Sequence, residues 1–150
     1  MPSGNWTVTV VLSPSVFGRV DYYRMGVGVV DEASGKALSL HYNTQAGNGG
    51  VEVTYFSSLT QYGTWLNGWA GSRPEYFFAR ISYDGAGYTF KISADYGATW
   101  KTVATAAKAS YFTATHVGLV LESYNPIQAG LLTISCFYWD DPDYPASNAI

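Results

Sequence analysis

Between residues 57 and 74 the chain carries side chains of the types that bind sugars. They combine flat aromatic rings with an amide, a guanidinium and, one residue beyond the stretch, a carboxylate: Tyr62, Trp65, Asn67, Trp69, Arg73 and Glu75. Sugars present apolar C–H faces that stack on aromatic rings, and hydroxyl groups that hydrogen-bond to amide, guanidinium and carboxylate groups. We therefore treat these six residues as a candidate ligand-binding surface.

The same aromatic residues also have a structural interpretation. Trp65 and Trp69 are four residues apart, a spacing at which large apolar side chains often belong to a core, here at one end of the domain. We expect residues 57–74 to form a long irregular loop, and loops of this length are commonly functional or mobile. A smaller cluster that could join or support this surface consists of Tyr22, Tyr23 and Arg24.

The glutamates are spread along the chain without a pattern typical of hydrolysis. Glycoside hydrolysis uses two carboxylates that flank the scissile bond. No local spacing brings such a pair together among Glu32, Glu52, Glu75 and Glu122. His and Cys metal-site spacings, a G-x-S-x-G nucleophile and a phosphate-binding loop are also missing from the sequence. We therefore predict no catalytic residue and expect that the chain is not an enzyme.

Three acidic residues near the C-terminus have two interpretations. Asp140, Asp141 and Asp143 stand close together, and calcium favours clustered oxygen ligands. A structural calcium ion is one interpretation, and a solvated acidic tail, which we favour, is the other. We predict no cofactor and no metal ligand.

The composition indicates one β-rich domain, and we expect it neither to bind nucleic acid nor to insert into a membrane. The chain has 150 residues, of which 17% are aromatic and only 13% charged, a balance that favours pleated, half-buried surfaces. A net charge of −3 with eight Lys and Arg offers no basic patch for a phosphate backbone. No stretch approaches the roughly 20 apolar residues of a membrane helix. The single cysteine, Cys136, lies in an apolar run, so we expect a buried thiol.

The clearest local signal is a pair of consecutive hairpins between residues 75 and 103. Bulky and polar residues alternate before and after a turn at residues 84–87, as in two paired strands. A second reversal follows at residues 93–100, where Asp95 can accept turn amides, Gly97 can adopt a positive φ and Trp100 is expected to return toward the core. This segment resembles the Asp-box, S-x-D-x-G-x-T-W, a hairpin device found in sialidases and several unrelated β-proteins.

Strands separated by turn signals recur along the rest of the chain. We predict them at 6–12, 25–30, 37–42, 51–56, 76–83, 88–92, 116–122 and 131–139, with residues 104–115 either a short helical turn or an extended crossover. The glycines at 26 and 28 indicate a face packed against a neighbouring backbone or ring. The pattern predicts an all-β, two-sheet antiparallel sandwich over residues 1–141 and a C-terminal tail at 142–150.

The order of these elements resembles the concanavalin A-like lectin/glucanase superfamily. Within it, the chain is most similar to small laminin-G-like jelly-roll domains of phage virion proteins and bacterial secreted proteins. The similarity extends from Trp6 to about Asp141. The motif residues are Arg80, Tyr88, Phe90, Ser93, Asp95, Gly97, Trp100 and Val117-Gly118-Leu119. The resemblance implies a jelly-roll fold and, in many members, carbohydrate binding or adhesion.

The residues and the resemblance together favour a non-catalytic binding or adhesion module in a phage virion (tail, fibre or decoration) or an extracellular bacterial protein. Its partner would be a glycan or cell-surface polysaccharide. The alternative is a purely structural virion domain that contacts other subunits of the particle or parent protein, or forms a homo-oligomer. A glycosidase is a third interpretation, which requires carboxylates distant in sequence to converge.

Overall fold

A computed structural model describes residues 4–16, 23–44, 49–58, 60–70, 76–123 and 130–140, without the side chains of 14–16, 69, 70, 109, 123 and 130–140. In these ranges the chain forms ten strands and one short helix. The elements are β1 (Trp6–Val16), β2 (Tyr23–Asp31), β3 (Lys36–Asn43), β4 (Gly50–Ser58), β5 (Gln61–Ala70), β6 (Phe77–Tyr83), β7 (Gly87–Ser93), β8 (Lys101–Ala107), α1 (Lys108–Tyr111), β9 (His116–Ser123) and β10 (Gly130–Asp140).

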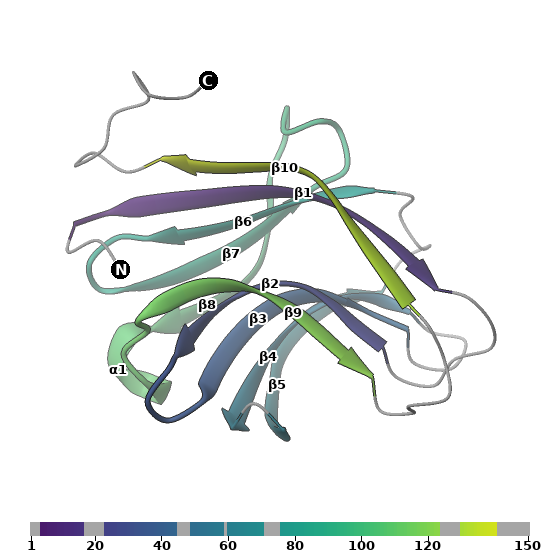
Figure 1. Ribbon diagram of the computed structural model, residues 1–150. Coiled ribbons are helices and arrows are strands. Elements are labelled where there is room, and N and C mark those ends of the chain that lie inside the picture. The colour runs from purple at the N-terminus through teal and green to yellow at the C-terminus, as the bar shows by residue number, and fades with distance from the viewer. Residues whose placement is uncertain are drawn as a thin grey trace.

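The strands form two antiparallel sheets that pack face to face (Figure 1). The first sheet has the order β10-β1-β6-β7-β8, and the second has the order β5-β4-β3-β2-β9. We call the first the β1 sheet and the second the β3 sheet, after one internal strand of each. The predicted all-β, two-sheet antiparallel sandwich is therefore confirmed.

The core lies between the sheets and follows the two-residue period of the strands. Val8, Val10 and Leu12 of β1 are fully buried, as are Val27 and Val29 of β2. Alternate residues along a strand point to opposite faces of its sheet, so the residues between these positions lie on the outer faces. The side chain of Cys136, predicted to be buried, lies outside the described residues, as do Asp141, Asp143 and the tail predicted at 142–150.

The Asp-box hairpin between β7 and β8 forms as its residue types predict. Asp95 accepts hydrogen bonds from the hydroxyl groups of Ser93 (2.6 Å) and Thr99 (2.5 Å) and from the Thr99 amide (2.9 Å). These bonds stabilise the ionised carboxylate and lower the pKa of Asp95 to about 2. The prediction for Trp100 was wrong: its ring lies outside the core cluster and stacks on Arg80, with the guanidinium carbon 3.7 Å from the ring centroid.

Three segments differ from the prediction by more than two residues. Residues 61–70, expected to belong to an irregular loop, form the edge strand β5, whose pairing with β4 shifts register at three points. Those bulges break the alternation of side chains on which a sequence-based assignment depends. Strand β1 continues past Pro14 to Val16. Beyond Leu12 it pairs with β10 but no longer with β6, so one side of the strand needs no backbone donor. A proline, which has no N–H group, is tolerated at such a position. Residues 104–107 are extended, and the helical turn is limited to α1.

The glycines of β2 let the neighbouring strand approach closely, as predicted. A Cβ at Gly26 would collide with the Leu40 carbonyl oxygen and would lie 2.5 Å from the Cα of His41. A Cβ at Gly28 would lie 2.7 Å from the Leu38 carbonyl oxygen. The missing side chains therefore leave the outer face of the β3 sheet free for the side chains of β3. Among the described residues, no helix has the length and apolar character needed to span a membrane.

We expect Gly26→Ala to lower the free energy of unfolding by more than about 2 kcal/mol, because backbone atoms of β3 would have to move. The matched control is Gly118→Ala on β9, where a Cβ would meet no atom within 4 Å. The control should change stability by less than about 0.5 kcal/mol. Urea unfolding of the two variants tests this, and equal effects would contradict the packing described for β2 and β3.

Candidate ligand-binding site

The outer face of the β3 sheet carries a connected group of polar side chains. They come from neighbouring strands whose register places them side by side: Arg24 is paired with Asn43 and Glu122, and His41 with Glu52. We call these residues, with Ser39 and Thr54, the polar network. In Figure 1 strand β9 is bowed, with its hollow side turned away from the β1 sheet, and the network lies on that side of the β3 sheet.

One oxygen of Glu52 is the centre of the network. Its Oε1 atom lies 3.0 Å from His41 Nε2 and accepts a hydrogen bond from Asn43 Nδ2 at 2.9 Å. The Thr54 hydroxyl is 3.5 Å away and Arg24 Nε is 3.6 Å away. Burial alone would raise the pKa of Glu52, but the His41 and Asn43 hydrogen bonds and the Arg24 charge outweigh it and lower this pKa. The carboxylate is therefore ionised at neutral pH.

His41 is completely buried although it lies on an outer face. Its Nδ1 atom is 2.6 Å from the Ser39 hydroxyl and its Nε2 atom is 3.0 Å from Glu52. Burial is the largest influence on the pKa of His41 and lowers it, and the hydrogen bond to Glu52 only partly opposes this. The neutral ring satisfies both neighbours when Nε2–H donates to Glu52 and Nδ1 accepts from Ser39, so we assign this tautomer.

Arg24 links two carboxylates that are far apart in the sequence. Its NH1 group donates to Glu122 Oε2 at 2.8 Å, and its Nε atom faces Glu52. The side chain of Arg24 is 12% exposed, and that of Glu122 is 31% exposed. No local spacing in the sequence brings Glu52 and Glu122 together, but antiparallel pairing across β9, β2, β3 and β4 brings both to the same guanidinium.

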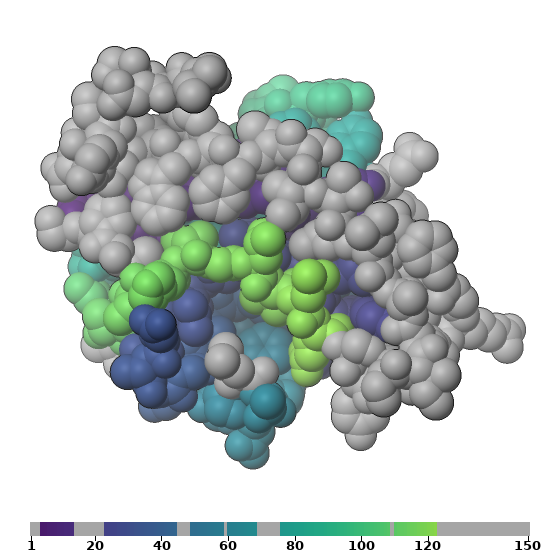
Figure 2. Space-filling view, viewed as in Figure 1, coloured from purple at the N-terminus to yellow at the C-terminus, as the bar shows by residue number. Residues whose placement is uncertain are grey.

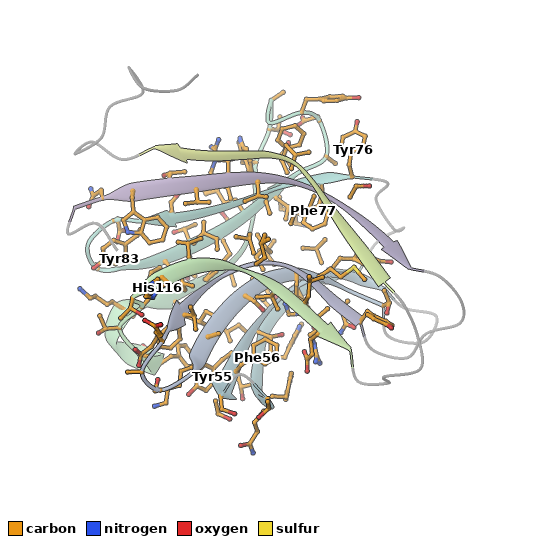
Figure 3. The ribbon with its side chains drawn as sticks, viewed as in Figure 1. Tyr55, Phe56, Tyr76, Phe77, Tyr83 and His116 are labelled. Atoms are coloured by element: carbon orange, nitrogen blue, oxygen red, sulfur yellow. The ribbon has the colours of Figure 1, made fainter. Side chains whose placement is uncertain are left out.

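Aromatic rings cover the network from the side of β4 and β5. The guanidinium carbon of Arg24 lies 5.1 Å from the ring centroid of Tyr62 and 5.8 Å from that of Phe56. Figure 3 shows Phe56 on the side of the β3 sheet that faces away from the β1 sheet. A Cβ at Gly68 would lie 3.1 Å from Glu52 Cβ and 3.2 Å from Trp65 Nε1, so the indole and Glu52 both lie beside this glycine.

The two outermost rings remain open to solvent. Tyr62 is 46% exposed and Trp65 is 53% exposed, whereas Phe56 is buried. Figure 2 shows this side of the molecule, with the green atoms of β9 beside the blue and teal atoms of β3 to β5. The candidate site is thus an ionised, hydrogen-bonded centre flanked by two exposed aromatic rings.

Of the three predicted site residues whose side chains the structure describes, two lie together. Tyr62 and Trp65 flank the polar network. Asn67 is directed elsewhere: its amide donates to the Val103 carbonyl of β8 at 2.7 Å and so ties the edges of the two sheets together. The backbone of Trp69 pairs with Val51, and its side chain lies outside the described residues, as do Arg73 and Glu75.

Sequence reasoning missed most of the polar network. Of the predicted supporting cluster, Arg24 belongs to the site, Tyr23 is buried and Tyr22 lies outside the described residues. A usable signal was the alternation of polar residues at 39, 41 and 43, on the face opposite to the apolar residues of β3. Within the part of the chain that the structure describes, no group of three or more His, Cys, Asp or Glu side chains could hold a metal ion.

No family model matches the chain, and no curated protein matches it in sequence. Solved structures do match its fold. A GH43 glycoside hydrolase engineered for both endo-xylanase and exo-arabinofuranosidase activity matches with a TM-score of 0.71 and 15% identity, over 91% of this chain and 29% of that chain. A functionally unknown protein from Saccharomyces cerevisiae matches with a TM-score of 0.68 and 17% identity, over 94% of this chain and 71% of that chain.

A phage protein also has this fold. The CBM2 module of the evolved Dit protein of Lactobacillus casei BL23 phage J-1 matches with a TM-score of 0.53 and 13% identity, over 93% of this chain and 62% of that chain. At these identities the likeness shows the β-sandwich fold alone. The chain spans less than a third of the length of the GH43 hydrolase.

The pKa of His41 predicts how stability depends on pH. The unfolded chain binds a proton near pH 6.5, whereas the folded chain resists protonation to lower pH, so stability falls as the pH falls through 6.5. The protonation of this one histidine can change the free energy of unfolding by at most about 1.4 kcal/mol per pH unit. Urea unfolding between pH 7 and 5.5 should show a smaller slope for His41→Gln than for the unchanged protein. His116→Gln, at a 56% exposed histidine, should retain the slope, and an unchanged slope in His41→Gln would contradict the assignment.

Proposed function

We propose that this domain is a non-catalytic carbohydrate-binding module with a concanavalin A-like jelly-roll frame, acting in adhesion to a glycan or cell-surface polysaccharide. The sugar binds on the outer face of the β3 sheet, against Tyr62 and Trp65. The observation that carries the proposal is that two half-exposed rings border a polar network that contains ionised carboxylates. Stacking on rings beside fixed hydrogen-bonding groups is the chemistry that sugar recognition requires.

The state of Glu52 supports binding over hydrolysis. A glycosidase needs a carboxylic acid with a raised pKa to protonate the leaving group. The pKa of Glu52 is lowered instead, and its Oε1 atom already serves His41 and Asn43. Glu122 is held by Arg24 at 2.8 Å. These contacts suit two carboxylates that orient a ligand rather than exchange protons with it.

The structural neighbours are consistent with this role and with a virion or extracellular location. This sandwich occurs in a glycoside hydrolase and in a CBM2 module of a phage Dit protein. We propose that the present domain acts in the same kind of setting, as part of a virion structure or of a protein secreted by a bacterium.

A purely structural virion domain is the second candidate. The observation in its favour is the exposure of apolar side chains on the edge strand β9, where Leu119 is 46% exposed and Leu121 is 63% exposed. Such residues suit contacts with another subunit or a second copy of the chain. In that case the domain would bind no glycan and would associate in a concentration-dependent way.

We expect Trp65→Ala to weaken glycan binding at least tenfold and Tyr62→Ala to weaken it severalfold, because each removes a stacking surface. A glycan array identifies the ligand, and calorimetry on the best ligand measures the change. Tyr96→Ala is the matched control, since Tyr96 is 75% exposed on the Asp-box hairpin of the other sheet. Equal loss in all three variants, or no loss in Trp65→Ala, would contradict this location of the site.

A further inference from the structure

We propose that the site selects uncharged glycans and rejects anionic ones such as uronate polymers. This inference rests on the proposed function and names the ligand class of the same site. It follows from the charges and the hydrogen-bonding atoms that the outer face of the β3 sheet presents.

The charges of the polar network do not cancel. Glu52 and Glu122 contribute two negative charges and Arg24 one positive charge, and His41 is neutral, so two minus one leaves one net negative charge. Arg24 is the only Lys or Arg at an outer-face position of β2, β3, β4, β5 and β9 in the part of the chain that the structure describes. Its charge is already shared between two carboxylates, so little remains to attract an anion.

Among the described residues of this sheet, the remaining Asp, Glu, Lys and His side chains lie at the turn of the β2–β3 hairpin. Glu32 is 80% exposed there, 3.8 Å from His116 Nδ1. Asp31 is paired with Lys36 across the hairpin, and its pKa is lowered mainly by its hydrogen bond with Ser34. The charge of Lys36 is balanced by Asp31, so these residues add no unbalanced positive charge to the sheet.

The oxygen atoms left open on the network are acceptors. Oε2 of Glu52 and Oε1 of Glu122 have no hydrogen-bond partner among the described residues, and neither atom is fully buried. A carboxylate oxygen accepts from the hydroxyl groups of a sugar, which can donate. A sugar carboxylate cannot donate, and it would be repelled by a charge of the same sign. Neutral hexoses and pentoses therefore fit this face, and uronates do not.

A glycan array that holds neutral polysaccharides (glucan, mannan, galactan and xylan) beside anionic ones (alginate, polygalacturonate and hyaluronan) tests this selectivity. At 20 mM and at 200 mM NaCl we expect binding only to neutral glycans, with affinities that change less than about twofold between the two conditions, because screening by salt acts on charged pairs. Binding that is confined to anionic glycans, or equal for both classes, would overturn the selectivity and leave the proposed function intact. Absence of binding to every glycan would instead overturn the proposed function and this inference with it.

A charge-neutral variant separates the effect of the negative charge from the effect of side-chain size. Glu122→Gln keeps the size of the side chain but makes the face neutral, so we expect severalfold weaker binding of the neutral ligand and at least tenfold better binding of its anionic analogues at 20 mM NaCl. The matched control is Glu32→Gln at the far end of the hairpin, which should change neither. An unchanged preference in Glu122→Gln would contradict the electrostatic origin of the selectivity.

Discussion

The convergence of hydrogen bonds on Oε1 of Glu52 is the constraint around which the outer face of the β3 sheet is arranged. A carboxylate that is partly removed from water needs partners: His41 and Asn43 of β3 supply hydrogen bonds, and Arg24 of β2 supplies a positive charge 3.6 Å away. His41 can occupy its buried position because the residue opposite it on β2, Gly26, has no side chain. The backbone of β2 thus determines where the network lies.

The same constraint gives the candidate site its shape. Arg24 is held between two carboxylates, and its guanidinium in turn lies beside the ring of Tyr62. Trp65 and Glu52 both lie beside Gly68 at the sheet edge. Polar groups that are fixed before a ligand arrives do not have to be ordered on binding, which lowers the entropic cost of recognition. The exposed rings at the sheet edge and the hydrogen-bonded carboxylates beside them are therefore parts of one arrangement.

Much of the fold could be predicted from the sequence, but less of the site could. Period-two alternation and the Asp-box residues around Asp95 report local geometry, so the hairpins and the two-sheet sandwich follow from them. Strand β5 was missed because the bulges in its pairing with β4 disrupt that period. Trp65 and Tyr62 were recognised by residue type. The contact of Arg24 with Glu52 and Glu122 depends on strand order, which no local spacing in the sequence reveals.

The polar network depends most directly on the neutral ring of His41, which donates a hydrogen bond to an ionised Glu52. Nitrogen-15 NMR of the imidazole ring measures the protonation state and the tautomer directly. We expect a neutral ring at pH 6.5, with the proton on Nε2 and a Nδ1 signal typical of an acceptor. A doubly protonated ring at that pH, or a proton on Nδ1, would contradict the arrangement on which the site depends.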